Sequence, residues 1–503
     1  MPELAVYTNN DAEVFVMDAS LTRVARSVGV YRGKLPRGLY KIRVVRAGAL
    51  REQLVELDER AQDHYLFITQ FSAIAPIGPM LRDVNRIETF AREVLEQVRG
   101  PAILVLAHGD AAVVDRKRPF AGASIFPWQG TRHAVKLDST PHSALIGEEV
   151  WSAAAIAADP AQGPFVLELR NGSRVSRQSV LVAQGWQTRV FLRAQRADGP
   201  SPFDVSIQMA RPESNVVYHD HWETVEVARS ALERGRAIFT SDRLVDELLH
   251  QKYDNPIAGI TGLHLFLDAR ARSEAGNTAY ELGPHAAARA GGAEGIVAEV
   301  LANLTALLHP DRARWLGERL KSYAAIQEEL AHEDPQWPDA PDLTALRLRA
   351  GRLREQVAIS SPPMFRVSWD VLKASAARDG DTWIGRGLWS VTGAAGAAGP
   401  YLAWAPGRHS ARRTLHGLVE QLAAAGLSDS SPPRSIATDR SDPARAESAA
   451  RSPDRDLAET LKLDEARFLP EFKKVVAAIA EGKEQAFADS FGIPLSIFQE
   501  KLR

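Results

Sequence analysis

The chain has 503 residues, of which 45% are hydrophobic and 25% are charged, a composition typical of a globular protein with several domains. Its net charge of −2 gives no overall attraction to nucleic acid or to anionic lipid. The sequence has no cysteine. This excludes cysteine nucleophiles, thiolate zinc sites, iron–sulfur clusters and disulfides, and it favours a reducing compartment.

The amino terminus, MPELAVYTNNDAEVFVMD, has neither the basic segment nor the apolar core of a signal peptide. No uninterrupted apolar stretch approaches the roughly 20 residues that a membrane span needs. We therefore predict a cytoplasmic protein without a membrane partner.

The first half of the sequence predicts β-structure, because apolar and polar residues alternate in several short segments. Residues 38–45 and 163–170 both show this period of two, which is typical of a half-buried strand. The two segments are 125 residues apart, and the offset continues downstream. Gln53, Val55 and Leu57 correspond to Gln178, Val180 and Val182, and residues 65–67 correspond to residues 190–192. This spacing predicts a duplicated β-unit.

Residues 13–57 combine a strand pattern, a short polar loop and an apolar-Pro-Gly turn at Leu35, Pro36 and Gly38, followed by further strand patterns. This arrangement resembles the PEGA type of small β-sandwich, although the Pro-Glu-Gly-Ala tetrapeptide itself is absent. Residues 163–193 resemble the later strands of the same module. The resemblance implies a duplicated β-sandwich-like N-terminal half that serves binding and not chemistry.

Residues 83–99 predict an amphipathic helix, because their apolar side chains line one face at helical spacing. Gly100 ends this helix, and a buried strand follows at residues 103–106. We therefore predict a β-sandwich-like unit with an inserted helix over residues 1–140 and a second β-unit over residues 141–215. His108, at the end of the buried strand, is predicted to lie in a tight turn.

From residue 222 the period of the apolar residues changes to 3.6, and Gly and Pro residues separate the segments. No tetratricopeptide or ankyrin period is present. We predict an all-α middle domain over residues 216–427. The fold class is therefore α+β, with several domains.

Residues 428–456 contain almost no bulky apolar side chain. Such a segment cannot offset the entropy lost on ordering, so we predict a disordered linker. An exposed linker is accessible to proteases. The candidate cleavage sites are its five arginines, Arg434, Arg440, Arg445, Arg451 and Arg455.

The sequence YHDHWE holds the strongest candidates for a metal site. His219, His221 and Glu223 carry the imidazole and carboxylate groups that bind zinc or iron. Adjacent histidines cannot easily reach one ion, however, and a helix start with Asp220 as its N-cap fits the same residues. Nucleotide and cofactor motifs are missing, so we expect no catalytic constellation, no metal and no cofactor.

The tail, residues 457–503, is predicted to be a small helical module. The spacing of Ala488, Gly492 and Phe498 is similar to that of a helix-turn-helix. The second helix would present three polar residues to a protein or to a DNA groove, namely Gln499, Lys501 and Arg503. The mixed charge of the tail favours a protein.

These features favour a non-enzymatic interaction or regulatory adaptor with a linker-tethered helical docking tail and a protein partner. The β-unit, together with residues 255–268 and 362–372, is similar to uncharacterised bacterial proteins associated with caspase-like protease systems. That similarity implies regulated proteolysis in a bacterial stress or defence pathway. Two alternatives stay open: a DNA-binding regulator that acts through the tail, and a metal-dependent enzyme with a dispersed site.

Overall fold

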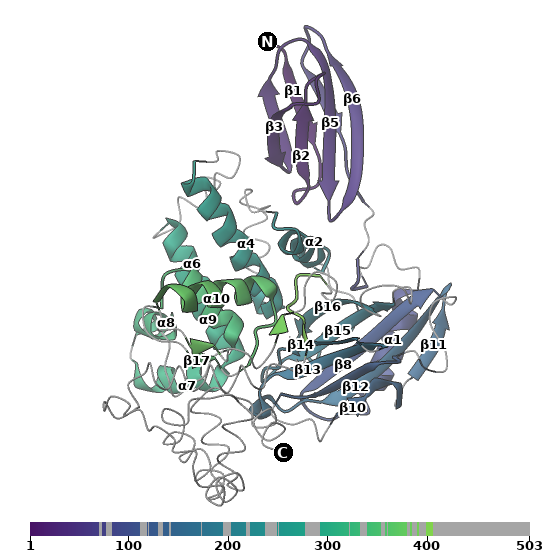
Figure 1. Cartoon of the computed structure of the whole chain (residues 1–503), viewed down its shortest axis with the longest axis vertical. Coiled ribbons are helices and arrows are strands. Elements are labelled where there is room, and N and C mark those ends of the chain that lie inside the picture. The colour runs from purple at the N-terminus through teal and green to yellow at the C-terminus, as the bar shows by residue number, and fades with distance from the viewer. Residues whose placement is uncertain are drawn as a thin grey trace, which may run out of the picture.

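The computed structural model shows a mixed α+β chain in which strands fill the first half and helices dominate after residue 221 (Figure 1). The residues that it describes are 1–69, 73–76, 83–110, 118, 120–128, 134–139, 142–172, 174–194, 203–217, 222–236, 249, 251–276, 292–320, 322–331, 340–353, 358–359, 361–379, 383–384, 390–391 and 399–405.

The N-terminal β-unit, residues 3–65, consists of two small sheets that share one hydrophobic core. Their orders are β3-β2-β5-β6 and β4-β1-β7. In β5, Tyr40, Ile42 and Val44 point inward because alternate side chains of a strand face one side, and Leu4 and Val6 of β1 lie in the same core. The strands are β1 (Glu3–Tyr7), β2 (Glu13–Met17), β3 (Arg23–Val28), β4 (Val30–Lys34), β5 (Gly38–Arg46), β6 (Ala49–Leu57) and β7 (Gln62–Tyr65).

The second β-unit, residues 102–210, has a five-stranded sheet in the order β11-β12-β8-β15-β16 and a six-stranded sheet in the order β10-β9-β13-β14-β20-β19. Helix α1 (Val84–Leu95) packs on β8, β11 and β12. The strands are β8 (Ala102–Asp110), β9 (Ala123–Pro127), β10 (Val135–Lys136), β11 (His142–Ile146), β12 (Glu149–Ala157), β13 (Phe165–Asn171), β14 (Arg174–Val180), β15 (Gln187–Ala194) and β16 (Phe203–Ala210), joined by β19 (Ser390–Val391) and β20 (Trp404–Ala405).

The same arrangement of seven strands occurs in both units. A central strand, β1 or β8, has an antiparallel neighbour (β4 or β12) and a parallel neighbour (β7 or β15). The other sheet has four antiparallel strands in the order β3-β2-β5-β6 or β10-β9-β13-β14.

The hairpins β5–β6 and β13–β14 also share their register. Arg43 pairs with Glu52 in the first hairpin, and Glu168 pairs with Arg177 at positions 125 residues further along. Each pair is an ion pair, with N–O distances of 2.7 and 2.6 Å, and the charges are exchanged between the strands. Equivalent positions in the two hairpins therefore make the same kind of contact.

The strand pairing shows that the boundary between the two β-units does not lie at residue 140, where the sequence predicts it. β8 and β9 precede that residue, but they pair with β12, β15 and β13, so the second unit begins at β8. The predicted helix within residues 83–99 is confirmed, although it precedes the second unit and does not interrupt the first. His108 lies within β8, which continues through Asp110, and not in the predicted turn.

The helices after residue 221 pack on the second β-unit, with which they share one continuous core. α4 is buried over residues 256–267; Asn255 caps it and Pro256 occupies its first position. The prediction that residues 216–427 form an all-α domain is wrong, because this range also contains four short strands. They are β17 (Ala358–Ile359), β18 (Trp383–Ile384), β19 and β20. The helices are α2 (Trp222–Glu233), α4 (Pro256–Glu274), α6 (Gly292–Leu308), α7 (Pro310–Arg319), α8 (Tyr323–Ala331), α9 (Pro341–Arg349) and α10 (Arg366–Asp379).

None of the helices in the described residues combines the length and the apolar composition that a membrane crossing requires. The predicted linker, residues 428–456, and the predicted tail, residues 457–503, lie outside the described residues.

Stability is expected to depend on pH through His309, which lies between α6 and α7. Burial, with smaller contributions from Arg312 and Arg347, lowers the pKa of His309 to about 4. An unfolded histidine titrates near pH 6.5, so the stability that neutral His309 provides is complete above that pH and is lost as the pH falls toward 4. The loss is about 1.4 kcal/mol per pH unit at most.

Thermal unfolding between pH 7 and pH 4.5 checks this prediction. His309→Gln should show a smaller fall in Tm with decreasing pH than the unmodified chain, because the titrating group is gone. The exposed His142 of β11 provides the matched control, and His142→Gln should keep the original slope. Equal slopes for all three proteins would contradict the prediction.

Candidate functional site

The N-terminal β-unit meets helix α2 through the β5–β6 turn and the start of β2. Ala47 and Gly48 form this two-residue turn, with φ of 45° and 87°, between the paired residues Arg46 and Ala49. Positive φ at both positions is the geometry of a type I′ turn. Gly48 also leaves room for Arg234, because a Cβ at this position would lie 2.5 Å from the guanidinium nitrogens of Arg234. The turn is therefore packed closely against the end of α2.

Arg46 connects the two sides of this junction. Its guanidinium binds both carboxylate oxygens of Asp11 at 2.8 and 2.9 Å, and it binds Glu223 of α2 at 2.5 Å. It also donates a hydrogen bond to the carbonyl oxygen of Ile68 at 2.9 Å. Burial acts to lower the pKa of Arg46, but the hydrogen bonds and charges of Asp11 and Glu223 outweigh it and raise the pKa. Arg46 therefore remains charged and can pair with both carboxylates.

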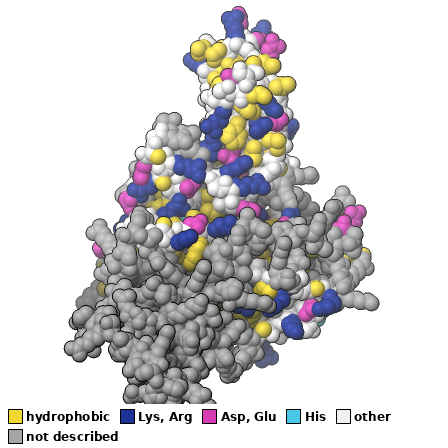
Figure 2. All heavy atoms as spheres, in the orientation of Figure 1, with side chains coloured by type: hydrophobic (Ala, Val, Ile, Leu, Met, Phe, Trp, Pro, Cys, Tyr) yellow, Lys and Arg dark blue, Asp and Glu magenta, His cyan; other side chains and the backbone are white. Residues whose placement is uncertain are grey.

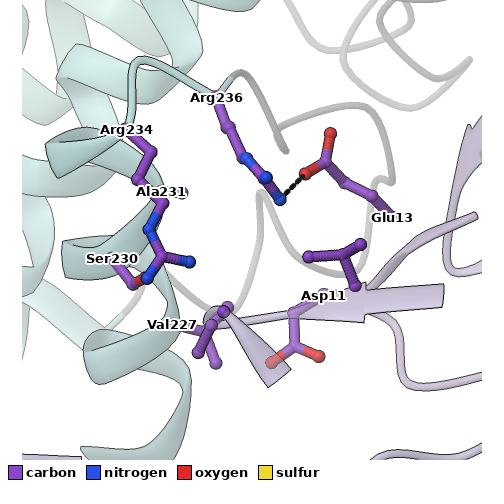
Figure 3. Close-up of a pocket in the computed structure, with 10 residues that line it drawn as sticks. Asp11, Glu13, Val227, Ser230, Ala231, Arg234 and Arg236 are labelled. Atoms are coloured by element: carbon purple, nitrogen blue, oxygen red, sulfur yellow. Dashed lines mark hydrogen bonds and ion pairs between the residues drawn. The ribbon is translucent and has the colours of Figure 1, made fainter. Parts of the chain in front are cut away.

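A second bridge across the junction runs through Glu13. The carboxylate of Glu13 binds Arg26 of β3 at 2.6 Å and Arg236, which follows α2, at 2.9 Å (Figure 3). Only 5% of the Glu13 side chain is exposed, whereas 37% of the Arg236 side chain is exposed, so solvent partly screens the pair that crosses the junction. Two such bridges hold the β-unit in one orientation on α2.

A cleft with an empty volume of about 240 Å³ lies at this junction. Asp11, Glu13, Ser230, Arg234 and Arg236 contribute to its wall (Figure 3). Its carboxylates are already bound by arginines. We interpret the cleft as the seam of a docked unit and not as a ligand site.

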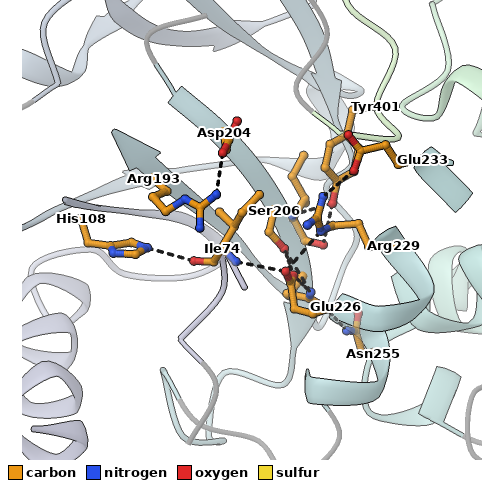
Figure 4. Close-up of polar contacts among 12 residues, drawn as sticks. Ile74, His108, Arg193, Asp204, Ser206, Glu226, Arg229, Glu233, Asn255 and Tyr401 are labelled. Carbon is orange, nitrogen blue, oxygen red and sulfur yellow. Dashed lines mark hydrogen bonds and ion pairs between the residues drawn. The ribbon is translucent and has the colours of Figure 1, made fainter. Parts of the chain in front are cut away.

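Glu226 of α2 anchors the helix to the second β-unit (Figure 4). This residue is 1% exposed, and its carboxylate accepts hydrogen bonds from Ser206 and from Gln208 of β16 and from Arg229 of its own helix. It also accepts the backbone N–H of Ile74 at 3.2 Å, in the segment between the two β-units. A buried carboxylate is stable only with such partners. These donors therefore fix α2, and with it the junction.

His108 continues the network on the side of the five-stranded sheet. One ring nitrogen lies 3.1 Å from the carbonyl oxygen of Ile74, and the other lies 3.2 Å from the carboxylate of Glu149. The ring stacks on Trp151 at a centroid distance of 4.7 Å. The hydrogen bond from His108 lowers the pKa of Glu149, although burial opposes it. Both nitrogens of His108 are therefore engaged, so the ring holds the segment around Ile74 in place.

Asn255 and Tyr401 connect β16 to the helices and to the last described segment. The Asn255 side chain donates to Gln208 at 2.6 Å and accepts the backbone N–H of Met209 at 3.1 Å. The Tyr401 hydroxyl accepts the backbone N–H of Ile207 at 2.8 Å. Burial is the main cause that raises the pKa of Tyr401. These contacts give hydrogen-bond partners to backbone N–H groups of β16. The network therefore has a structural role.

A serine–histidine pair lies inside the helical part, where Nε2 of His264 is 3.0 Å from the hydroxyl of Ser368. A catalytic pair needs a histidine that accepts the serine proton and a carboxylate at the other ring nitrogen. Here the carboxylate, Asp342, accepts from Ser368, and the guanidinium of Arg349 faces Nδ1 of His264 at 3.5 Å. Burial and the Arg349 charge lower the pKa of His264. The hydrogen bonds and charges around His264 are therefore arranged in the reverse order to those of a catalytic triad. The pair instead joins α4, α9 and α10.

The residues predicted as metal ligands are only partly described. Glu223 lies in the first turn of α2, where Arg46 binds its carboxylate, while His219 and His221 lie outside the described residues. Within the described part of the chain, no group of three or more His, Cys, Asp or Glu side chains could hold a metal ion. The five linker arginines and the tail residues Gln499, Lys501 and Arg503 also lie outside it.

The junction residues were missed by the sequence analysis, although one of them carries a readable signal. Arg46 continues the inward-facing row of Tyr40, Ile42 and Val44 in β5. An arginine at an inward position requires a buried carboxylate, which identifies Arg46 as half of an ion pair. Its partners, Asp11 and Glu223, have no such local signature.

No family model, no curated protein and no solved structure matches this chain. The resemblance of residues 13–57 to PEGA modules therefore stays a prediction. Any functional proposal has to rest on the geometry of the chain's own residues.

Two substitutions at the Arg46 bridge should separate docking from folding. Glu223→Gln removes the half-exposed partner across the junction and should loosen the docking by about 1 kcal/mol. Asp11→Asn removes the buried partner within the β-unit and should destabilise the unit itself by roughly 3 kcal/mol.

Hydrogen–deuterium exchange on the full chain measures both effects. Glu223→Gln should increase exchange at residues 46–49 and 222–236 only, because the core of the β-unit is intact. Asp11→Asn should also increase exchange in β2 and β5. Identical exchange maps for the two variants would show that the bridge does not connect two separate bodies.

Proposed function

We propose that this chain is a non-enzymatic interaction protein whose N-terminal β-unit is a binding module presented by the rest of the molecule. The observation that supports it is the distribution of exposed apolar side chains. Of the twelve large hydrophobic side chains that are exposed in the described residues, nine lie within residues 1–67. Figure 2 shows hydrophobic side chains gathered on the surface of the unit that projects from the body. Concentrated exposed apolar side chains are typical of interaction sites.

The outer face of the four-stranded sheet carries the most regular part of this set. Leu39 of β5 and Leu50 and Leu54 of β6 point outward, and Leu50 and Leu54 are 56% and 66% exposed. Between them, Glu52 binds Lys41 at 2.8 Å and Arg43 at 2.7 Å. Apolar side chains separated by charged pairs give both contact area and specificity for a protein surface.

The loop between β2 and β3 adds an apolar side chain at a strained position. Leu21 has a φ of 60° and is 65% exposed. Asp18 holds the loop by accepting the backbone N–H groups of Ser20 and Thr22 at 2.9 and 3.0 Å. Left-handed backbone at a bulky residue costs free energy, and such strain is concentrated at functional positions. This geometry supports a role for the loop in binding.

The proposal includes the view that both β-units are copies of one β-sandwich module of the PEGA-like type. The shared strand order, the common hairpin register and the exchanged ion pairs support a duplication. The second copy is covered by α1 and by the later helices, whereas the first contacts the body at its junction end (Figure 1). The first copy is therefore the one available to a partner.

The linker and the tail would form a tethered second docking element. The composition of residues 428–456 and the helical pattern of residues 457–503 support this role. Cleavage at the linker arginines would release the tail, as expected of a target of regulated proteolysis in a bacterial stress or defence pathway. Tethering would raise the effective concentration of the tail at a bound partner.

Substitutions on the outer face test the binding module. Leu39→Lys together with Leu54→Lys should reduce the amount of partner protein recovered with the chain from its native host by at least about tenfold, because charge replaces apolar contact area. Tyr323→Lys on α8 is the matched control, since Tyr323 is equally exposed but lies far from the β-unit. Quantitative mass spectrometry of affinity-purified material measures recovery. Equal losses with the control, or no loss, would contradict the proposal.

Limited trypsin digestion tests the tether. The first cuts should fall after the linker arginines and leave a stable fragment that contains residues 1–405, because an unfolded segment is cleaved faster than a packed core. Intact-mass measurement of the early fragments gives the sites. A linker that survives while the body is cut would exclude the tethered tail.

A further inference from the structure

Strand β6 forms an edge of the four-stranded sheet, and no strand of the described residues covers it. It pairs with β5 over nine consecutive residues without a break in register. Natural edge strands are usually protected by a bulge, a proline, a short length or charged side chains. β6, with the sequence ALREQLVEL, is long and has no bulge and no proline, so its charged residues Arg51, Glu52 and Glu56 are its main protection against unselective pairing.

The open edge exposes backbone groups in a regular row. Arg46 and Ala49 close the two-residue turn as a hydrogen-bonded pair, so pairing with β5 uses the peptide groups of every second residue from Ala49. The peptide groups of Leu50, Glu52 and Leu54 therefore point away from β5. Glu56 follows the same pattern, and its outward carbonyl oxygen accepts a hydrogen bond from the Gln62 side chain at 2.9 Å. Within the described residues, no strand pairs with this edge.

The equivalent edge of the second β-unit is occupied. β14 corresponds to β6 in strand order and register, and β20 pairs with it there, with Trp404 opposite Arg177. Arg177 corresponds to Glu52, 125 residues earlier. An added strand at this position is thus part of the fold of the second unit. In the first unit the same position is open and carries a carboxylate where the second unit carries a guanidinium.

We infer that the β6 edge receives an extended segment of a partner protein in which apolar and basic side chains alternate. This inference rests on the proposed binding function of the N-terminal β-unit. Strand addition of this kind uses backbone hydrogen bonds for affinity and alternate side chains for specificity.

The charges of β6 define the partner. Its outward row is Leu50, Glu52, Leu54 and Glu56, and β5 already complements this row on the inner side with Leu39, Lys41, Arg43 and Val45. A strand on the open side meets the same row, so it gains most from basic residues opposite Glu52 and Glu56 and from apolar residues opposite Leu50 and Leu54. A second copy of β6 in antiparallel pairing centred on this row would bring glutamates into opposite or diagonal positions, where like charges repel. The charge pattern therefore favours a different, basic partner.

A peptide that copies residues 38–46, GLYKIRVVR, is a suitable probe because it reproduces the strand that β6 already prefers. We expect saturable binding of the fluorescein-labelled peptide to the full-length chain, measured by fluorescence anisotropy. A version with Glu at the three basic positions should not bind. Hydrogen exchange should slow at Leu50, Glu52 and Leu54 when the peptide is bound.

Leu54→Pro removes an outward N–H without breaking a hydrogen bond to β5, so the sheet should remain folded. It should weaken peptide binding by up to about tenfold, as expected for the loss of one hydrogen bond. Leu54→Ile is the matched control because it keeps both the N–H and the apolar side chain. Thermal unfolding of both variants verifies that the chain is folded.

Binding that is equal in Leu54→Pro and Leu54→Ile, or exchange protection elsewhere than β6, would overturn the inference. Absence of binding up to millimolar peptide would overturn it as well. These results are distinct from failure of the proposed function. If the variant with Leu39→Lys and Leu54→Lys loses its partner protein while the peptide does not bind to the unmodified chain, the β-unit binds its partner through side chains. In that case only the inference about the β6 edge fails.

Discussion

The buried carboxylate of Glu226 fixes helix α2, and the arrangement of the molecule depends on that helix. A carboxylate side chain with almost no contact with water must be satisfied by donors, and Ser206, Gln208, Arg229 and the backbone of Ile74 supply them. These donors come from a strand, a helix and the segment between the two β-units. Because they meet at one carboxylate, the second sheet and α2 have a single relative position. The junction with the N-terminal β-unit, through Arg46 and Glu13, is built on the helix so placed.

The two β-units show how one strand arrangement can serve two roles. In the second unit, α1 covers part of the five-stranded sheet, the later helices continue its core, and β20 occupies the open edge of β14. In the first unit the corresponding edge and the outer face remain exposed, and the cross-strand ion pair has its charges exchanged. The same strand order is thus part of a covered core in one unit and leaves an accessible surface in the other.

Several buried serine and histidine side chains of the body join secondary-structure elements. Ser206 donates to a carboxylate, His108 is engaged at both nitrogens, and the pair of His264 and Ser368 has the reverse of catalytic polarity. Each of these side chains is buried and lies in a contact that joins secondary-structure elements. Reactive groups need access to substrate and an open side, whereas these groups use their capacity for hydrogen bonds within the fold.

The sequence by itself determined the local structure: the alternating strands, the helix within residues 83–99, the offset of 125 residues between the hairpins and the inward position of Arg46. These features depend on spacing along a few residues, which the period of apolar side chains records directly. The sequence did not determine which strands pair over long distances, so it placed the unit boundary at residue 140 and missed the return of β20 to β14. It also gave no sign that Arg46 would meet Glu223, 177 residues away. Only the tertiary structure decided these contacts, because non-local pairing follows from the packing of the whole core and leaves no periodic signal in the chain.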